Sequence, residues 1–243
     1  MQRRRDGRDA DDMRSLEFEV NYISNAEGSC LVKLGSTWVV CTASVDERVP
    51  PFLRRTGQGW VTAEYGMLPG ATSIRVQREA VKGRQSGRTQ EIQRLIGRSL
   101  RAAVNLEALG ERQITIDCDV IQADGGTRTA AINGGYIALY LALKSLHSKG
   151  LLRRIPIVKY VAAISCGIVT GRRLIDLAFI EDSNADVDAN FIFGSDGNLV
   201  EVQCTGEKTS FSCEQLQGMC AAAKDACMTI VEKQRAVLNT TYL

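Results

Sequence analysis

Blocks of strand-like and helix-like segments, arranged similarly in both halves of the chain, constrain its fold more than any other feature. In the first half, β-branched and other apolar residues gather in short runs at positions 18–23, 29–34, 37–45, 60–65 and 113–120. Two further stretches carry apolar residues at helical spacing: Ile92, Leu95, Ile96, Leu100 and Ala103, then Ile132, Tyr136, Leu139, Leu143 and Leu146. We therefore expect a sheet covered by two amphipathic helices.

The second half repeats this arrangement after a connection marked by Lys149-Gly150 and Pro156. Strand-like runs occupy positions 158–168, 174–179, 187–193 and 199–204, and a helical pattern follows at 213–235. These segments predict an α+β fold of two similar β-α sub-domains that share one core. We place them at residues 1–150 and 151–243.

The composition excludes several classes of protein. The 243 residues are 44 % hydrophobic, but no apolar stretch is long enough to cross a bilayer. The basic start of the chain, residues 1–6, is followed by no apolar segment, so we expect no secretory signal. With no Cys-x-x-Cys pair and one histidine, His147, the sequence favours neither a zinc site nor a disulfide framework. We expect a cytoplasmic protein without a membrane role.

Charge is distributed unevenly, although the net charge is only +2. Between residues 75 and 101 there are eight basic residues against two acidic ones, Glu79 and Glu91. Residues 70–86, which overlap this basic segment, are rich in Gly, Arg and Gln and predict a loop. Such a local basic excess suits a polyanion, although a solvated helix face has the same composition.

Two glycine-containing segments place an arginine where a helix is predicted to begin. They are Gly87-Arg88-Thr89 and Gly125-Gly126-Thr127-Arg128. Unpaired N–H groups give a helix N-terminus partial positive charge, so an arginine there is unfavourable unless an anion lies nearby. Either segment alone is more simply a turn with a solvent-facing arginine. Together they predict a phosphate or sulfate site.

An acidic segment at positions 181–190 is the second candidate. If residues 186–193 form a strand, then Asp186, Asp188 and Asn190 share one face. Carboxylates crowded in this way favour a hard cation such as Mg²⁺, which takes one or two carboxylates together with substrate phosphate oxygens. An Asp-rich turn that caps backbone groups is an equally good interpretation at this point.

A phosphate site beside a cation site predicts phosphoryl transfer on a polyanion. There is no Gly-x-x-x-x-Gly-Lys-Ser/Thr loop, and a single histidine argues against a histidine-based nuclease. Inorganic phosphate is itself a competent nucleophile, so catalysis can depend on positioning and charge neutralisation without a strong general base.

Several longer motifs resemble the ribonuclease PH family in the same order along the chain. They are Asp6-Gly7-Arg8, the segments at 59–69 and 87–96, the segment at 121–130, and Glu181-Asp182-Ser183. The resemblance covers nearly the whole chain. It implies a fold similar to ribosomal protein S5 domain 2 and a homohexamer built as a trimer of dimers.

The resemblance also implies an activity. Inorganic phosphate attacks the 3′-terminal phosphodiester of RNA, especially of tRNA precursors, and releases nucleoside diphosphates; the reverse reaction adds nucleotides. Residues that match the phosphate site are Arg88, Gly126, Thr127 and Arg128, and those that match the metal pair are Asp182 and Asp188. The resemblance implies that Asp182, Asp188, Arg88 and Arg128 are the catalytic residues. Arg75, Arg78 and Arg94 are expected to contact RNA.

One departure from the family pattern concerns RNA binding. An arginine commonly follows the Leu-Pro of the 59–69 motif, and this chain has Gly70. We expect weaker RNA binding with a shallower salt dependence, since one phosphate contact is missing. The alternative function is a non-catalytic RNA-binding subunit of an exosome-like ring. Such subunits are expected to lose arginines or carboxylates that this chain retains.

Overall fold

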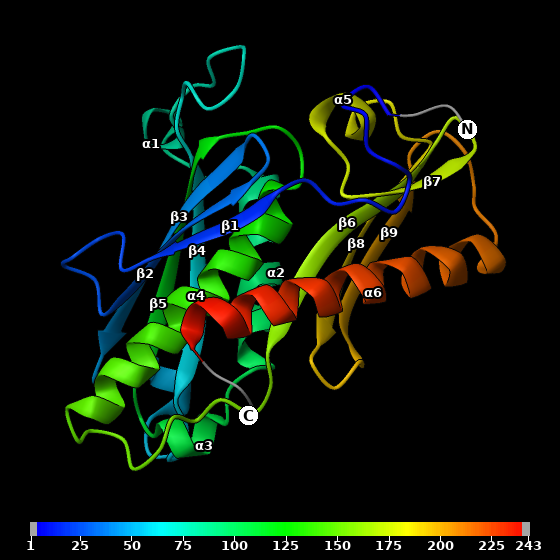
Figure 1. Cartoon of the computed structure of the whole chain (residues 1–243). Coiled ribbons are helices and arrows are strands. Elements are labelled where there is room, and N and C mark those ends of the chain that lie inside the picture. The colour runs from blue at the N-terminus through cyan, green and yellow to red at the C-terminus, as the bar shows by residue number, and fades with distance from the viewer. Residues whose placement is uncertain (1–3, 240–243) are drawn as a thin grey trace.

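Two sheets enclose a central helix in the computed structural model, which describes residues 4–239 (Figure 1). The first sheet has the strand order β1-β2-β3-β5-β4, with β1 Leu16–Val20, β2 Gly28–Leu34, β3 Thr37–Asp46, β4 Trp60–Met67 and β5 Gln113–Gln122. Among the strands of the described residues, only β4 and β5 pair in parallel. The second sheet has the order β7-β6-β8-β9, with β6 Val161–Val169, β7 Arg172–Ile175, β8 Val187–Gly194 and β9 Leu199–Gly206, all antiparallel.

Helix α4, Thr127–Ser148, is the element that unites the two sheets. It packs on β2, β3 and β5 of the first sheet and on β6 of the second. Its residues are buried on nearly every side, so the prediction of an amphipathic helix with Ile132 to Leu146 on one side is wrong in this respect: α4 has no polar face and lies between the two sheets. Asn133 accepts a hydrogen bond from the Ala163 N–H at 2.8 Å and donates one to the Ala163 carbonyl at 2.9 Å. One hydrophobic cluster therefore extends through both halves, and the predicted α+β fold with a shared core is confirmed.

The other helices cover the outer surfaces. Helix α2, Gly87–Arg101, packs on β4 and α4, and α6, Cys213–Leu238, packs on β6 and β8. Short helices are α1 Glu79–Lys82, α3 Leu106–Leu109 and α5 Phe179–Asp182, with a 3-10 turn at Pro51–Leu53. In the described part of the chain, none of the helices has the length and apolarity that crossing a membrane requires.

The structure corrects several predicted boundaries. The strand expected at 18–23 ends at Val20, because Asn21 takes a left-handed conformation with φ 56°. The strand expected at 174–179 also stops early: Asp176 has φ 54° and turns the chain, and α5 follows. The predicted loop at 70–86 contains the helical turn α1, and α3 was not predicted. The division of the chain at residue 150 stays a prediction, and residues 1–3 of the basic start lie outside the described part.

Candidate active site

A pair of glycines shapes the loop in front of α4. Gly125 and Gly126 have φ values of 74° and 65°, a conformation that side chains with a Cβ rarely adopt. A Cβ on Gly125 would also lie 2.5 Å from the Leu177 carbonyl oxygen. The loop brings the chain directly into α4, whose first turn has no acidic residue and no capping side chain. This helix start can therefore accept an anion.

The start of α2 is arranged differently from the prediction. Ser86 caps the helix by accepting a hydrogen bond from the Thr89 N–H, and Glu79 of α1 accepts bonds from Ser86 N–H at 3.0 Å and Thr89 Oγ1 at 2.7 Å. The Glu79 carboxylate therefore already offsets the partial positive charge at the N-terminus of α2. What α2 offers to a ligand is the exposed Arg88 side chain, which makes no hydrogen bond or ion pair among residues 4–239.

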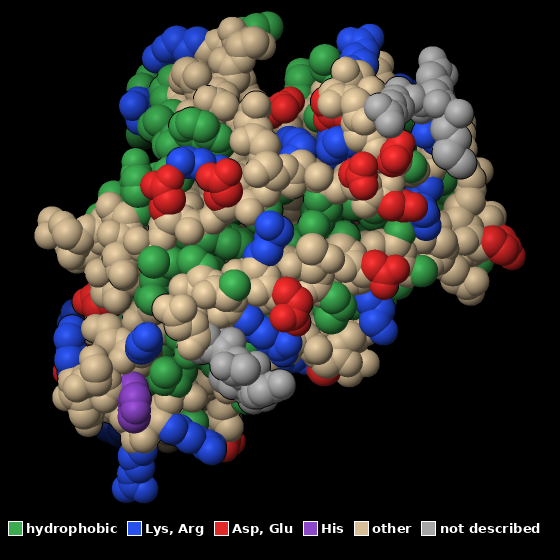
Figure 2. Space-filling view, viewed as in Figure 1, with side chains coloured by type: hydrophobic (Ala, Val, Ile, Leu, Met, Phe, Trp, Pro, Cys, Tyr) green, Lys and Arg blue, Asp and Glu red, His purple; other side chains and the backbone are tan. Residues whose placement is uncertain are grey.

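One cavity of about 270 Å³ gathers all the residues predicted to bind phosphate and metal. Its lining includes Arg88, Gly126, Thr127, Arg128, Asp182 and Asp188. A second, more open cavity runs along β9 and shares Arg88, Arg128 and Asp188 with the first. Figure 2 shows acidic and basic side chains together in the hollow between the α1 and α5 sides of the molecule. The two helix starts and the acidic segment, distant in sequence, therefore form a single site.

Asp182 and Asp188 carry the strongest electrostatic conflict in this site. Burial raises the pKa of both carboxyl groups. For Asp188 the neighbouring Asp182 carboxylate adds to this effect and Arg128 opposes it, with a resulting pKa of about 6. Two partly desolvated carboxylates that repel each other are stabilised by a cation between them.

The oxygen donors present suit a hard divalent cation. Asn190, 4 % exposed, lines both cavities beside Asp188, and its amide has no hydrogen bond within the described residues. No group of three or more His, Cys, Asp or Glu side chains in residues 4–239 could hold a metal. Two carboxylates and an amide, completed by phosphate oxygens, match the way Mg²⁺ is commonly bound. Asp186, expected on the same face, precedes β8 and lines neither cavity.

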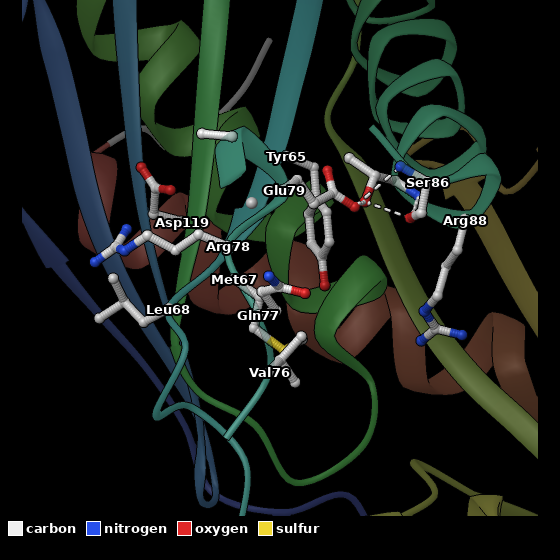
Figure 3. Close-up of a pocket in the computed structure, with 13 residues that line it drawn as sticks. Tyr65, Met67, Leu68, Val76, Gln77, Arg78, Glu79, Ser86, Arg88 and Asp119 are labelled. Atoms are coloured by element: carbon white, nitrogen blue, oxygen red, sulfur yellow. Dashed lines mark hydrogen bonds between the residues drawn. The ribbon is translucent and has the colours of Figure 1, made fainter. Parts of the chain in front are cut away.

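Tyr65 connects this site to a third cavity of about 390 Å³ beneath the 70–86 segment. Its hydroxyl lies 2.9 Å from Thr127 Oγ1, and burial raises its pKa. Figure 3 shows Arg78 and Asp119 on one side of Tyr65 and Arg88 on the other. The neutral phenol can therefore orient the Thr127 hydroxyl toward a bound anion.

The three arginines expected to contact RNA lie in different places. Arg78 lines the third cavity, and Arg75 is exposed on the same segment. Arg94 is exposed on α2 and lines none of the three cavities. Their contact with RNA stays a prediction.

A buried ion network near the site was not predicted from the sequence. Asp176, fully buried, accepts two hydrogen bonds from the Arg14 guanidinium at 2.6 and 2.9 Å and one from the Arg14 N–H at 2.8 Å. Arg14 also donates to the Asp124 carbonyl, in the residue before the glycine pair. Arg4 donates to Glu181 of α5 and to the Asp176 carbonyl. The network joins the glycine loop to α5, which carries Asp182. Two family motifs contribute to it, since Arg8 of Asp6-Gly7-Arg8 donates to the Asp176 carbonyl at 3.1 Å and Glu181 begins Glu181-Asp182-Ser183.

Family models match most of the chain. The model for domain 1 of the 3′ exoribonuclease family (RNase PH) matches residues 12–144, and that for domain 2 matches residues 159–226. The chain belongs to the ribonuclease PH family. The sequence resemblance is thereby confirmed.

Solved structures share the ribonuclease PH fold at low sequence identity. Rice (Oryza sativa) Rrp46 has a TM-score of 0.78 at 19 % identity and covers 97 % of this chain and 100 % of its own. The Archaeoglobus fulgidus exosome with RNA bound to the active site gives 0.80 at 23 %, covering 95 % and 92 %. An archaeal exosome core gives 0.77 at 22 %, covering 96 % and 91 %. At these identities the similarity concerns the fold.

Proposed function

We propose that this member of the ribonuclease PH family is a phosphate-dependent 3′-to-5′ exoribonuclease. The observation that carries the proposal is the shared cavity, where Arg88 and Arg128 face Asp182 and Asp188. Arg128 has only long contacts, 3.5 Å to Glu91 Oε1 and 3.3 Å to Gln203 Oε1. Both guanidiniums can therefore turn to an inorganic phosphate, with Thr127 and the Gly126 loop on its other side.

The reaction follows from this placement. An oxygen of inorganic phosphate forms a bond to the phosphorus of the 3′-terminal phosphodiester, and the bond from that phosphorus to the 3′ oxygen of the preceding nucleotide breaks. That 3′ oxygen takes up a proton, and a nucleoside diphosphate leaves. The arginines hold the nucleophile in line and offset the charge of two approaching anions. Asp182, Asp188 and Asn190 would hold Mg²⁺, which neutralises charge on the phosphate oxygens.

We extend the proposal to the family's substrate and assembly. tRNA precursors are the proposed RNA, the chain is proposed to assemble as a homohexameric ring of dimers, and the proposed compartment is the cytoplasm. The exosome structures, one with RNA bound, support an RNA partner and a ring-shaped assembly.

The second candidate is a non-catalytic RNA-binding subunit of an exosome-like ring. Its specific support is the similarity to exosome proteins, which the fold comparison favours at least as strongly as an independent enzyme. Against it, the chain retains both arginines and both carboxylates of the cavity.

One assay separates the two. The protein is incubated with 3′-tailed RNA and Mg²⁺, with and without phosphate, and the products are identified. Nucleoside diphosphates that form only with phosphate support the enzyme. RNA binding without any product supports the ring subunit, and nucleoside monophosphates without phosphate contradict both.

A further inference from the structure

A second basic surface lies at the C-terminal end of α4, remote from the cavity. We call it the distal basic surface and define it by Lys144, His147, Lys149, Arg153 and Arg154, all exposed. Residues 144–159 contain no Asp or Glu. None of the four Lys and Arg side chains makes an ion pair within the described part of the chain. Figure 2 shows several Lys and Arg side chains around the single histidine at this end of the molecule.

These side chains stand on a rigid turn. Gly150 has φ 74° and donates from its N–H to the His147 carbonyl at 3.0 Å, while the Leu151 N–H donates to the Leu146 carbonyl at 3.0 Å. The His147 ring nitrogen Nδ1 lies 2.9 Å from the Leu152 carbonyl oxygen, and Leu152 is buried. The helix end is thus closed by its own backbone, which fixes the positions from which the exposed cations extend.

Helix stabilisation explains only part of this pattern. Lys144 and Lys149 interact favourably with the negative end of the α4 dipole. Arg153 and Arg154 lie beyond the helix end and face no carboxylate partner, since Glu107 of the adjoining α3 forms no ion pair with them. Some exposed cations elsewhere do have such partners, as in Arg98 with Glu201 and Arg48 with Asp46. The unpaired charge at this end therefore has no structural role that the fold requires.

The position of the surface relates it to the active-site cavity. Helix α4 begins at Thr127 in that cavity and ends at Ser148, so its 22 residues separate the two sites by about 33 Å. An RNA backbone carries a charge every few ångströms, and only a chain longer than the cavity reaches both sites. Residues 144–159 contain no Phe, Tyr or Trp, and the His147 ring is held against the Leu152 carbonyl oxygen, so phosphates rather than stacked bases are the groups to be bound.

We propose that the distal basic surface binds the phosphodiester backbone of RNA upstream of the 3′ end held in the cavity. The proposal rests on the proposed function for the choice of RNA as the polyanion. Binding here is independent of base sequence, depends on salt and adds affinity only for long RNA.

The test uses the full chain with Arg153 and Arg154 both changed to alanine. Binding is measured across a salt series for an oligonucleotide of about five nucleotides, comparable with one short single-strand site, and for one of about 30. For the long RNA we expect at least a fivefold weaker affinity and a salt slope shallower by about 1.4, since two phosphate contacts are lost. Affinity for the short RNA and phosphate-dependent release from it should not change.

Matched controls and contrary outcomes are available. Lys224→Ala with Lys233→Ala removes two exposed charges of α6 and should leave both RNAs unaffected. Unchanged affinity and slope for the long RNA in the arginine variant overturn the proposal. A change in the mass measured by light scattering, without an RNA effect, assigns the surface to a subunit contact instead. If the short RNA yields no diphosphates but long-RNA binding still requires the arginines, the proposed function fails and this inference stands.

Discussion

Two groups of arginines lie near the glycine loop in opposite environments. Arg4 and Arg14, each under 10 % exposed, are satisfied by Asp176, Glu181 and backbone carbonyls. Arg88 and Arg128 line open cavities, and Arg88 has no partner within residues 4–239. The residue type alone therefore does not reveal what an arginine does. Its burial and its hydrogen-bond partners distinguish a guanidinium that stabilises the fold from one that is available to bind a ligand.

Desolvation is the physical basis of this difference between the buried and the cavity-lining arginines. A buried charge is tolerated only when its hydrogen bonds are made within the protein, so the partners of Arg14 are fixed. A charge beside a water-filled cavity keeps its hydration until an anion replaces the water. The following substitutions exploit this difference.

The largest effect is expected from Asp176→Asn. The change keeps the shape of the side chain but leaves Arg14 without its buried counter-charge, which typically costs about 3–5 kcal/mol. The free energy of unfolding, measured in urea, should fall by that amount. Asp11→Asn, which breaks the exposed pair with Arg173, should cost less than about 1 kcal/mol. Similar small losses for both variants contradict the structural role given to the network.

Arg128→Ala should show the opposite pattern. Losing a charge-assisted contact to phosphate is worth about 1.5–3 kcal/mol, so the half-saturating phosphate concentration should rise roughly 10- to 100-fold. RNA binding and the free energy of unfolding should change little. Arg98→Ala is the matched control, because Arg98 pairs with Glu201 and lines none of the three cavities. Equal losses in phosphate and RNA affinity would argue against a phosphate-binding role for Arg128.

The sequence predicted the open arginines better than the buried ones. An arginine at a glycine-containing helix start conflicts with the helix dipole, and that local conflict is visible without a structure. The Arg14–Asp176 pair joins residues 162 positions apart, and nothing local marks it. The left-handed turn at Asp176 was missed for the same reason, and a strand was expected through it.

The helices were predictable where apolar residues recur at helical spacing over a long run, as in α2 and α6; α4 was also predicted as a helix, but its burial on nearly every side was not. The four-residue helices α1, α3 and α5 were less predictable, because they are too short to show a period. The role of Glu79 was also hidden, because it depends on how α1 folds back on the start of α2.

Asp188→Asn tests the strained carboxylate pair. The pKa of Asp188 is raised to about 6, so its charged form disfavours the folded state, and this cost grows as pH rises through that value. Without Mg²⁺, the variant should be about 1–2 kcal/mol more stable than the wild type at pH 7.5 and equally stable near pH 4. Denaturant unfolding at both pH values measures this, and saturating Mg²⁺ should narrow the gap. A variant less stable at pH 7.5 refutes the electrostatic account.

Gly70→Arg should give the smallest effect. A Cβ at this position meets nothing within 4 Å, so the arginine can be accommodated. One added phosphate contact should steepen the salt dependence of single-stranded RNA binding by about 0.7 and leave the half-saturating phosphate concentration unchanged. Gly70→Ala serves as the uncharged control. An unaltered slope shows that position 70 does not face RNA in this chain.

The most direct test of the phosphate site follows labelled inorganic phosphate. Wild type and Arg128→Ala are incubated with 3′-tailed RNA, Mg²⁺ and limiting labelled phosphate, and the released nucleotides are separated. Our account predicts that the label appears in the terminal phosphate of nucleoside diphosphates, and that the variant incorporates it at least tenfold more slowly. Released nucleotides without label, or equal incorporation by both proteins, would contradict it.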